Sequence, residues 1–190
     1  VSYDAYSLES GNYYLDTDLE FSYELIEMPV LFIDGDVNLC LNGHSIILAS
    51  SQSSVIEVIK GKSLTLTDCK GGGNISHKGI YSAGHGITTA GTFNMYGGKI
   101  TDCVNLYSVT GGVYIENSSV FNMYGGTIEN CSGCQGGAVG ISGASPIGPP
   151  ADRVYAKFNM YGGEIKNCTD NWYGGGAVCM YGTSPTEFNM

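Results

Sequence analysis

One six-residue stretch, FNMYGG, occurs three times in this chain and constrains its fold more than any other feature. The copies begin at Phe93, Phe121 and Phe158, and the residues Phe188 to Met190 repeat the first three letters. Successive starts are 28, 37 and 30 residues apart, and the longest interval contains the segment 142–157, SGASPIGPPADRVYAK. Without about nine residues of that segment the period is again close to 28 residues, which is typical of a repeat architecture.

Each repeat unit contains three short apolar pieces. A glycine-led piece such as Gly176-Ala177-Val178 comes first, FNMYGG follows, and a piece such as KITDC ends the unit. Within Phe-Asn-Met-Tyr, apolar and polar side chains alternate, which is typical of a strand with one buried face. Three such strands in ~28 residues, each ended by glycine or asparagine, fit one coil of a parallel β-helix. We therefore predict an all-β parallel β-helix (solenoid) of about six coils with three short strands per coil.

The first half of the chain carries a weaker form of the same repeat. An apolar residue, a second one two positions later and an isoleucine further on mark the core positions of each unit. This spacing aligns Leu39 with Leu64 and Phe93. Residues 1–30 are then expected to form an N-terminal cap or first coil, and residues 31–190 the β-helix with a loop insertion at 142–157. The whole is predicted to be a fragment of a longer protein.

Identical residues in successive units should stack as ladders when the coils lie on one another. Phe, Met and Ile fill the interior, and the cysteine after each isoleucine points inward as a small, reduced apolar group. The Asp or Asn before that cysteine and the Gly-Gly pair suit corners that need positive φ, and stacked corner amides are expected to hydrogen-bond between coils. The predicted ladders are Phe93, Phe121, Phe158 and Phe188; Met95, Met123, Met160 and Met190; Ile100, Ile128 and Ile165; and Cys103, Cys131 and Cys168, with corners at Asp102, Asn130 and Asn167.

The charge balance narrows the classes of partner. The chain has 8 Lys and Arg against 18 Asp and Glu, so its net charge is −10. This sign repels phosphate backbones and anionic lipids, so we expect no nucleic acid and no membrane surface as partner. No run reaches the ~20 apolar residues of a membrane span, so we expect no membrane insertion in this segment.

The repeat motifs resemble those of a known class of protein. The FNMYGG-x-I units, the GGAV pieces at 136–139 and 175–178, and VNLCLNGHSI from Val37 are similar to the glycine-rich repeats of bacterial cell-surface, adhesin-like proteins. More broadly, the chain resembles the right-handed parallel β-helix domains of the pectin-lyase-like superfamily. The resemblance implies a right-handed coil path and an extracellular location, with attachment to the cell surface through parts of the protein outside this segment. It implies no single activity, because the fold carries lyases, hydrolases, adhesins and passive stalks.

The outward positions of the FNMYGG strands form the first candidate ligand-binding site. A row of aromatic faces beside a row of amides is suited to a sugar chain or a protein partner. The alternative is that identical residues in stacked coils only stabilise one another. The residues concerned are Tyr96, Tyr124 and Tyr161 with Asn94, Asn122 and Asn159.

The loop insertion 142–157 is the second candidate ligand-binding site. Loops that leave a rigid scaffold often carry function, and proline lowers the entropy lost when a loop is ordered on binding. The alternative is a tolerated surface insertion. The residues predicted to contact a partner are Pro146, Pro149, Asp152, Arg153 and Tyr155.

Catalytic and metal chemistry find little support in the sequence. Glycoside hydrolysis needs two carboxylates within about 5–10 Å of each other, and no acidic pair recurs in the well-aligned units. Asp34 and Asp36 flank a glycine and favour a turn, and Asp16 and Asp18 lie in the predicted cap. We expect no catalytic residue, no cofactor and no metal site. The scattered candidates for metal or redox chemistry are His44, His77, His85 and the Cys131-x-x-Cys134 pair.

We therefore expect a non-catalytic extracellular binding module of a bacterial surface protein. Its partner would be a host protein, such as an immunoglobulin or a mucosal glycoprotein, or a glycan, besides the rest of the parent surface protein. A passive structural stalk is the first alternative. A polysaccharide lyase or glycoside hydrolase of the pectin-lyase-like superfamily is the second.

Overall fold

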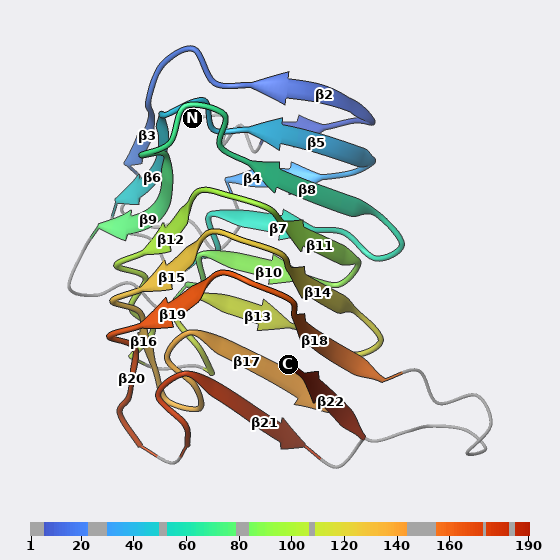
Figure 1. The fold of residues 1–190 in the computed structure, drawn as a ribbon, viewed down its shortest axis with the longest axis vertical. Helices are drawn as coiled ribbons and strands as arrows, with labels where there is room; N and C mark the ends of the chain where they lie inside the picture. The colour runs from blue at the N-terminus through green and yellow to red at the C-terminus, as the bar shows by residue number, and fades with distance from the viewer. Residues whose placement is uncertain are drawn as a thin grey trace.

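The chain folds as a parallel β-solenoid, as the sequence predicted. The structure is a computed structural model, and it describes residues 6–22, 30–49, 53–78, 84–106, 109–143, 155–172, 174–182 and 185–190. Its described residues form strands and no helix, and the coils stack along one axis from the N-terminal to the C-terminal end (Figure 1). Within these ranges there is accordingly no helix with the length and apolar character of a membrane span.

Three long parallel sheets run along the solenoid, and each complete coil contributes one strand to each of them in turn. Sheet A has the order β1-β4-β7-β10-β13-β17-β21, sheet B the order β2-β5-β8-β11-β14-β18-β22, and sheet C the order β3-β6-β9-β12-β15-β19. Among the described residues, sheets A and B hold seven strands and sheet C six, which makes six complete three-strand coils and two strands of a further one and so differs slightly from the expected six. A small fourth sheet pairs β16 (Ser132–Gly133) with β20 (Thr169–Asp170).

The strands are short and recur at equivalent positions in successive coils. Sheet A consists of Tyr6–Leu8, Leu31–Ile33, Ile56–Val58, Ile87–Thr89, Val113–Ile115, Val139–Gly143 and Val178–Gly182. Sheet B consists of Gly11–Tyr14, Asp36–Cys40, Ser63–Thr67, Thr92–Met95, Val120–Met123, Ala156–Met160 and Thr186–Asn189. Sheet C consists of Leu19–Ser22, Ser45–Ala49, Asn74–Lys78, Lys99–Thr101, Thr127–Glu129 and Glu164–Lys166.

The phenylalanine ladder forms as predicted. Phe93, Phe121, Phe158 and Phe188 pair in register, and their ring centroids lie 4.7, 4.8 and 5.1 Å apart in nearly parallel planes. This separation equals the spacing of neighbouring strands, so each ring stacks on the ring of the next coil. The first three rings are fully buried and form the centre of the hydrophobic core.

The methionine ladder is only partly as predicted. Met95 and Met123 are buried, and Met160 is partly buried against the core. Met190 was expected to point into the interior, but it is 95% exposed. The reason is its position directly after β22, the edge strand of sheet B, which has a neighbour on one side only.

In the first half of the chain, the predicted alignment was wrong by two residues. Leu64 pairs with Val37 rather than with Leu39, and Leu39 instead pairs with Leu66 and thus with the methionine ladder. Val37, Leu39 and Leu41 are all buried and alternate with outward side chains. An apolar pattern of period two looks the same after a shift of two residues, so it fixes the buried face but not the register.

The corners use the residues that the repeat predicted. The second glycine of each FNMYGG unit has a positive φ, from 80° at Gly98 to 91° at Gly163. Asp102, Asn130 and Asn167 have φ between 53° and 55° and turn the chain out of sheet C. Both sets occupy the left-handed region, which glycine, asparagine and aspartate adopt most easily.

The cysteines fall into two groups. Cys103 and Cys131 are buried and Cys168 is partly buried against the core, all three as free thiols, as the ladder predicted. The Cys131 thiol donates to the Glu129 carbonyl at 3.3 Å, and its pKa lies well above the usual value because of the neighbouring Cys103 thiol. Such thiols are poor nucleophiles. Outside this ladder, a disulfide joins Cys40 to Cys69, whose Cα atoms are 6.4 Å apart, a pairing that the repeat did not predict.

Candidate binding face

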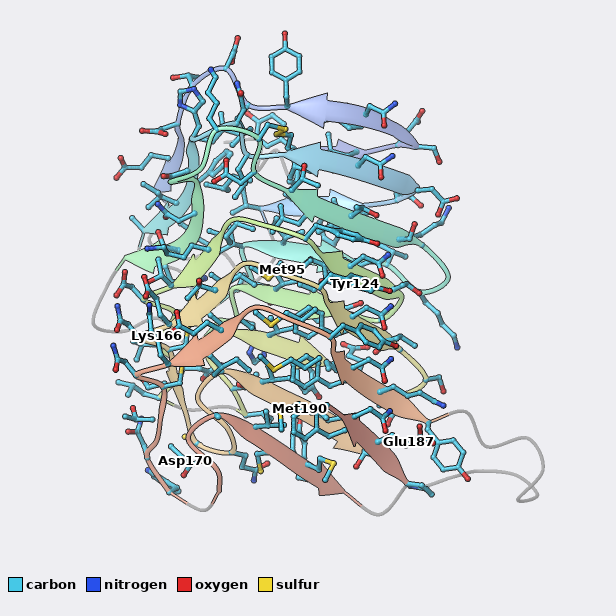
Figure 2. All side chains as sticks on the ribbon, viewed as in Figure 1. Met95, Tyr124, Lys166, Asp170, Glu187 and Met190 are labelled. Carbon is cyan, nitrogen blue, oxygen red and sulfur yellow. A yellow bond between two sulfur atoms is a disulfide. The ribbon has the colours of Figure 1, made fainter. Side chains whose placement is uncertain are left out.

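The outer face of sheet B carries two parallel rows of polar side chains over the FNMYGG coils. In β11, β14 and β18 the Phe and Met side chains point into the solenoid, so the alternating Asn and the following Tyr point away from it. Strand pairing places Asn94, Asn122 and Asn159 in one row, and the tyrosines that follow form the second. Figure 2 shows Tyr124 on this outer side of the ribbon. The structure therefore brings the six predicted residues together.

The asparagine row is a continuous hydrogen-bonded ladder. The Nδ2 group of Asn122 donates to Oδ1 of Asn94 at 2.9 Å, and Asn159 donates to Asn122 at 2.9 Å. Asn189 continues the row by donating to Asn159 at 2.8 Å. The coil-to-coil amide bonds that were predicted for the corners thus occur on the strands of sheet B. Each amide keeps one N–H group and one oxygen lone pair for another partner.

The tyrosine row is a stack of rings. The centroids of Tyr96 and Tyr124 lie 4.5 Å apart, and those of Tyr124 and Tyr161 lie 5.0 Å apart, in nearly parallel planes. The three residues are 53%, 41% and 66% exposed, in chain order. Because the rings cover one another, the row presents ring edges and phenol groups rather than the aromatic faces that the sequence predicted.

The two rows carry no charge at neutral pH. Partial burial and the neighbouring phenols raise the pKa of Tyr124 above its ordinary value, so the central hydroxyl is a neutral donor and acceptor. An ion pair on β18 and β22 is also neutral as a whole, since Lys157 Nζ lies 3.0 Å from Glu187 Oε2. The same ammonium lies 5.8 Å from the ring centre of Tyr155. Tyr155 therefore lies directly before β18, beside the Lys157 side chain.

Four of the five loop residues that were expected to contact a partner lie outside the part of the chain that the structure describes. This applies to Pro146, Pro149, Asp152 and Arg153, which belong to the range 144–154. The second predicted contact region thus remains a prediction, with Tyr155 as its described residue.

Thr65 separates the asparagine ladder from a second pair of stacked asparagines in the first coils, and this gap offers a stability test. Asn38 donates to Asn12 at 2.8 Å, but Thr65 stands in register between Asn38 and Asn94. We expect Thr65→Asn to add hydrogen bonds on both sides and to raise the free energy of unfolding by about 1 kcal/mol. Chemical denaturation would measure the change. Thr65→Ser, which has no amide, is the matched control, and an equal gain there would contradict the ladder explanation.

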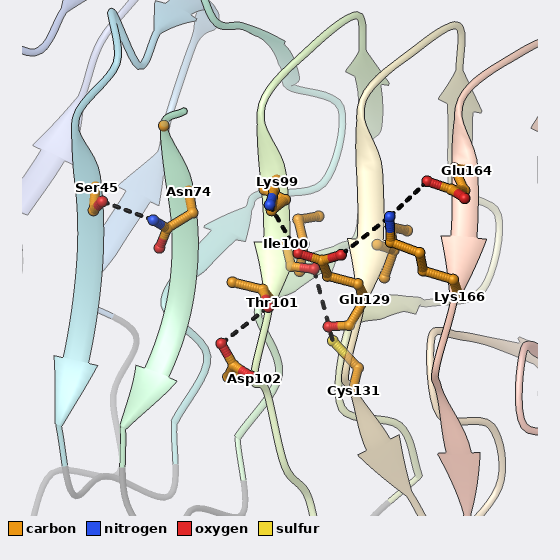
Figure 3. A network of polar contacts seen from close by, with 12 residues as sticks. Ser45, Asn74, Lys99, Ile100, Thr101, Asp102, Glu129, Cys131, Glu164 and Lys166 are labelled. Carbon is orange, nitrogen blue, oxygen red and sulfur yellow. Dashed lines mark hydrogen bonds and ion pairs between the residues drawn. The ribbon is translucent and has the colours of Figure 1, made fainter. Parts of the chain in front are cut away.

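A network of ions on sheet C was not found by sequence reasoning. The Glu129 carboxylate lies between two lysines, with Lys99 Nζ at 2.8 Å and Lys166 Nζ at 3.4 Å (Figure 3). Lys166 also contacts Glu164 at 2.8 Å. The hydrogen bond from Lys99 is the main reason why the pKa of Glu129 lies below its ordinary value. These ions satisfy one another between coils, which indicates a structural role.

Three of the four aspartates considered from the sequence have structural contacts. Asp34 contacts Lys62 at 3.2 Å, Asp36 accepts from the Ser63 hydroxyl at 2.7 Å, and Asp18 accepts from the Ser45 amide at 2.8 Å. Two further carboxylates are Glu57 in β7 and Glu116, which directly follows β13. Burial and, to a lesser extent, Glu116 raise the pKa of Glu57. The two glutamates lie in different repeat units, so no local motif could have indicated them.

The histidines and the Cys-x-x-Cys pair do not assemble into a metal site within the described ranges. His44 contacts Asp18 at 3.4 Å, whereas His77 and His85 lie together elsewhere in the solenoid. The Cys134 thiol donates to the Leu106 carbonyl at 3.2 Å, and Cys131 belongs to the buried ladder. Neither group therefore forms a site that indicates a function.

Comparison of this chain with protein-family models, with curated proteins and with solved structures finds no match.

Proposed function

We propose that this chain is a non-catalytic, extracellular binding module of a bacterial surface protein. It is of the adhesin-like kind found among the β-helix proteins of the pectin-lyase-like superfamily. Its ligand is the glycan part of a host molecule, such as a mucosal glycoprotein or an immunoglobulin. The observation that carries the proposal is the pair of uncharged rows, asparagine and tyrosine, side by side on the outer face of sheet B.

The chemistry of the two rows suits a chain of sugars. Each ladder amide has a free N–H group and a free lone pair, and each phenol both donates and accepts. Sugar hydroxyls also donate and accept, so a linear glycan can form hydrogen bonds with successive coils. The ring edges of the tyrosines add apolar contact along the same line.

Rigidity and charge favour the same class of ligand. The amides are fixed by their neighbours and the rings by stacking, so little side-chain entropy is lost when a ligand binds. The net charge of −10 disfavours polyanionic ligands, whereas the neutral rows accept an uncharged polymer.

A passive stalk is the second candidate, and one observation favours it. The tyrosine rings stack on one another and the amides bond to one another, so both rows stabilise the solenoid even without a ligand. A stalk would need no further partner on this face. The two functions therefore differ only in whether the exposed edges of the rows contact another molecule.

A binding experiment separates these functions. The purified chain is applied to an array of host and microbial glycans and, separately, incubated with mucosal secretions and serum. We expect retention of glycan-bearing species. Replacing Tyr96, Tyr124 and Tyr161 together by serine should weaken that binding at least tenfold, because interfacial tyrosines commonly contribute more than about 1 kcal/mol each.

The matched control is Tyr14→Ser. Tyr14 is 72% exposed on the same sheet, but the coils of Cys40 and Thr67 separate it from the tyrosine row. This variant should bind within about twofold of the unaltered chain. Retention of nothing by the unaltered chain would favour the stalk. Release of shorter sugars from a bound polysaccharide would instead indicate an enzyme and direct attention to Glu57 and Glu116.

A further inference from the structure

The asparagine and tyrosine rows on the outer face of sheet B repeat with the spacing of the coils. Ring centroids along the tyrosine row lie 4.5 and 5.0 Å apart, and those of the phenylalanine ladder inside the solenoid lie 4.7, 4.8 and 5.1 Å apart. Neighbouring strands of a sheet lie ~4.8 Å apart, so the backbone sets this repeat. A ligand that contacts every coil must therefore have nearly the same repeat along its own length.

The backbone also sets the distance across the two rows. Asn122 and Tyr124 are two positions apart, and the Tyr124 amide donates to the Met95 carbonyl at 2.8 Å, so interstrand pairing continues to the tyrosine. Residues two positions apart in a strand lie about 6.6 Å from each other. A pyranose ring with the hydroxyl groups on its two edges covers this width. One sugar can therefore contact the amide and the phenol of a single coil.

Few linear polymers match both distances. An extended peptide presents side chains on one side every ~6.6 Å, so it is out of step with the rows after one coil. A sugar chain linked equatorially through C1 and C4, as in β-1,4-linked glucose, is straight and advances per sugar by nearly one coil spacing. The α-1,4 and β-1,3 linkages bend a chain into a helix, so only short pieces of it can follow a straight row. Acidic polymers are disfavoured by the net charge of −10.

The side chains of the rows suit the alternation within a β-1,4-linked glycan. Successive sugars are turned over relative to each other, so each row meets the other edge of the sugar at every second coil. Asn94, Asn122 and Asn159 are joined by hydrogen bonds of 2.9 Å, and each amide keeps a donor and an acceptor. The Tyr124 phenol is also a neutral donor and acceptor, because burial and the neighbouring phenols raise its pKa. Identical residues can therefore bind both orientations of the sugar.

The length of the rows sets the number of sugars that can bind. Three coils carry both residues, as the pairs Asn94 with Tyr96, Asn122 with Tyr124, and Asn159 with Tyr161. The next coil adds Asn189, which donates to Asn159 at 2.8 Å. On the other side, Thr65 is in register with Asn94, and its short side chain ends the row of amides. Four consecutive coils thus form one continuous site.

We propose that the two rows bind a straight, neutral, β-1,4-linked stretch of glycan, with one sugar per coil, four sugars in all and the glycan axis along the solenoid. This assignment of the linkage rests on the glycan-binding function proposed above. The amides and phenols hold the two edges of each sugar, and the coil spacing selects the linkage. Discrimination increases with length, because a mismatch of repeat accumulates from coil to coil.

Isothermal titration calorimetry of the unaltered chain with defined oligosaccharides tests this proposal. The β-1,4-linked probes are cello-oligosaccharides and N-acetylated chito-oligosaccharides of two to six sugars, and the comparison probes are malto-oligosaccharides (α-1,4) and laminari-oligosaccharides (β-1,3). Affinity for β-1,4-linked probes should rise about fivefold per sugar, the effect of roughly one added hydrogen bond, up to four sugars and then stay within about twofold. At four sugars, the comparison probes should bind at least about tenfold more weakly.

Two variants with the same substitution test the position of the sugars along the row. Tyr124→Ser interrupts the row and should weaken binding of the two-sugar and the four-sugar cello-oligosaccharide at least about fivefold. Tyr161→Ser leaves Tyr96 and Tyr124 adjacent, so it should weaken binding of the four-sugar probe to the same extent but that of the two-sugar probe less than about threefold. Circular dichroism checks that both variants are folded, and the comparison of linkages in the unaltered chain needs neither of them.

The failure of this assignment differs from the failure of glycan binding itself. Equal affinity for all linkages, or no rise in affinity between two and four sugars, would overturn the β-1,4 assignment while glycans still bind. An equal loss of two-sugar binding in Tyr124→Ser and Tyr161→Ser would also overturn it. If no sugar binds, either on the array or in solution, the assignment and the proposed function fail together.

Discussion

Replacing Phe121 by alanine should lower the free energy of unfolding by about 4 kcal/mol. The ring is fully buried and stacked on both sides, 4.7 Å from the ring of Phe93 and 4.8 Å from that of Phe158. The backbone hydrogen bonds of sheet B hold the neighbouring coils at a fixed spacing. The coils therefore cannot move together to fill the cavity that alanine would leave, and the full cost of the lost contacts remains.

Phe188→Ala is the control for this prediction. Phe188 occupies the same ladder, but it is 36% exposed and has a stacked ring on one side only. Its replacement should lower the free energy of unfolding by about 1 to 2 kcal/mol. Denaturant unfolding of both variants gives the comparison. Equal losses at the two positions would show that the ladder is not the main source of the core's stability.

Gly111→Ala should reduce the free energy of unfolding by more than about 3 kcal/mol, or prevent folding. A Cβ atom at this position would lie 2.1 Å from the Cys103 carbonyl oxygen and 2.4 Å from that of Ser132. Both contacts are backbone atoms held by hydrogen bonds, since Ser132 N donates to Cys103 O at 3.0 Å. Relief of the overlap would therefore break pairing between coils.

Gly61→Ala is the control that measures the cost of a positive φ without a steric clash. Gly61 has a φ of 76°, but no atom lies within 4 Å of the place where its Cβ would be. Its replacement should cost only about 1 kcal/mol, from the left-handed backbone alone. Thermal unfolding of the two variants, checked by circular dichroism, measures both effects. A loss at Gly111 no larger than at Gly61 would contradict the close approach of the backbone.

The structure of the FNMYGG units could be predicted well because their sequence determines both the buried face and the register. Alternation fixes which side chains are buried, and identity of sequence fixes which residues meet in neighbouring coils. Phe93 and Phe121 therefore pair as expected. In the first half, only alternation is present, and the shift of Leu39 by two residues shows that a periodic pattern cannot set the register. The disulfide between Cys40 and Cys69 depends on that register, which is why the sequence did not indicate it.

The sequence could predict which residues form the candidate face, but not how their side chains are presented to a ligand. Outward positions of period two identified Asn94 and Tyr96, and the structure places them in adjacent rows. Whether the tyrosines offer faces or edges depends on the separation of the rings, and a distance of 4.5 Å between Tyr96 and Tyr124 leaves the edges. The carboxylate of Glu129 and its two lysines come from three units, so only the folded chain brings them together.

Pairing of each strand only with its neighbours has a consequence for how such a protein evolves. Phe121 presents the same ring to the coil before and to the coil after it, so a duplicated unit would find a matching surface on both sides. Gain or loss of a whole unit then changes the length of the molecule without redesign of the core. The length of a loop can also change, because the unit between β17 and β18 contains extra residues while Phe121 and Phe158 remain in register. Selection can thus vary length and loops separately from the sequence that makes the coils stack.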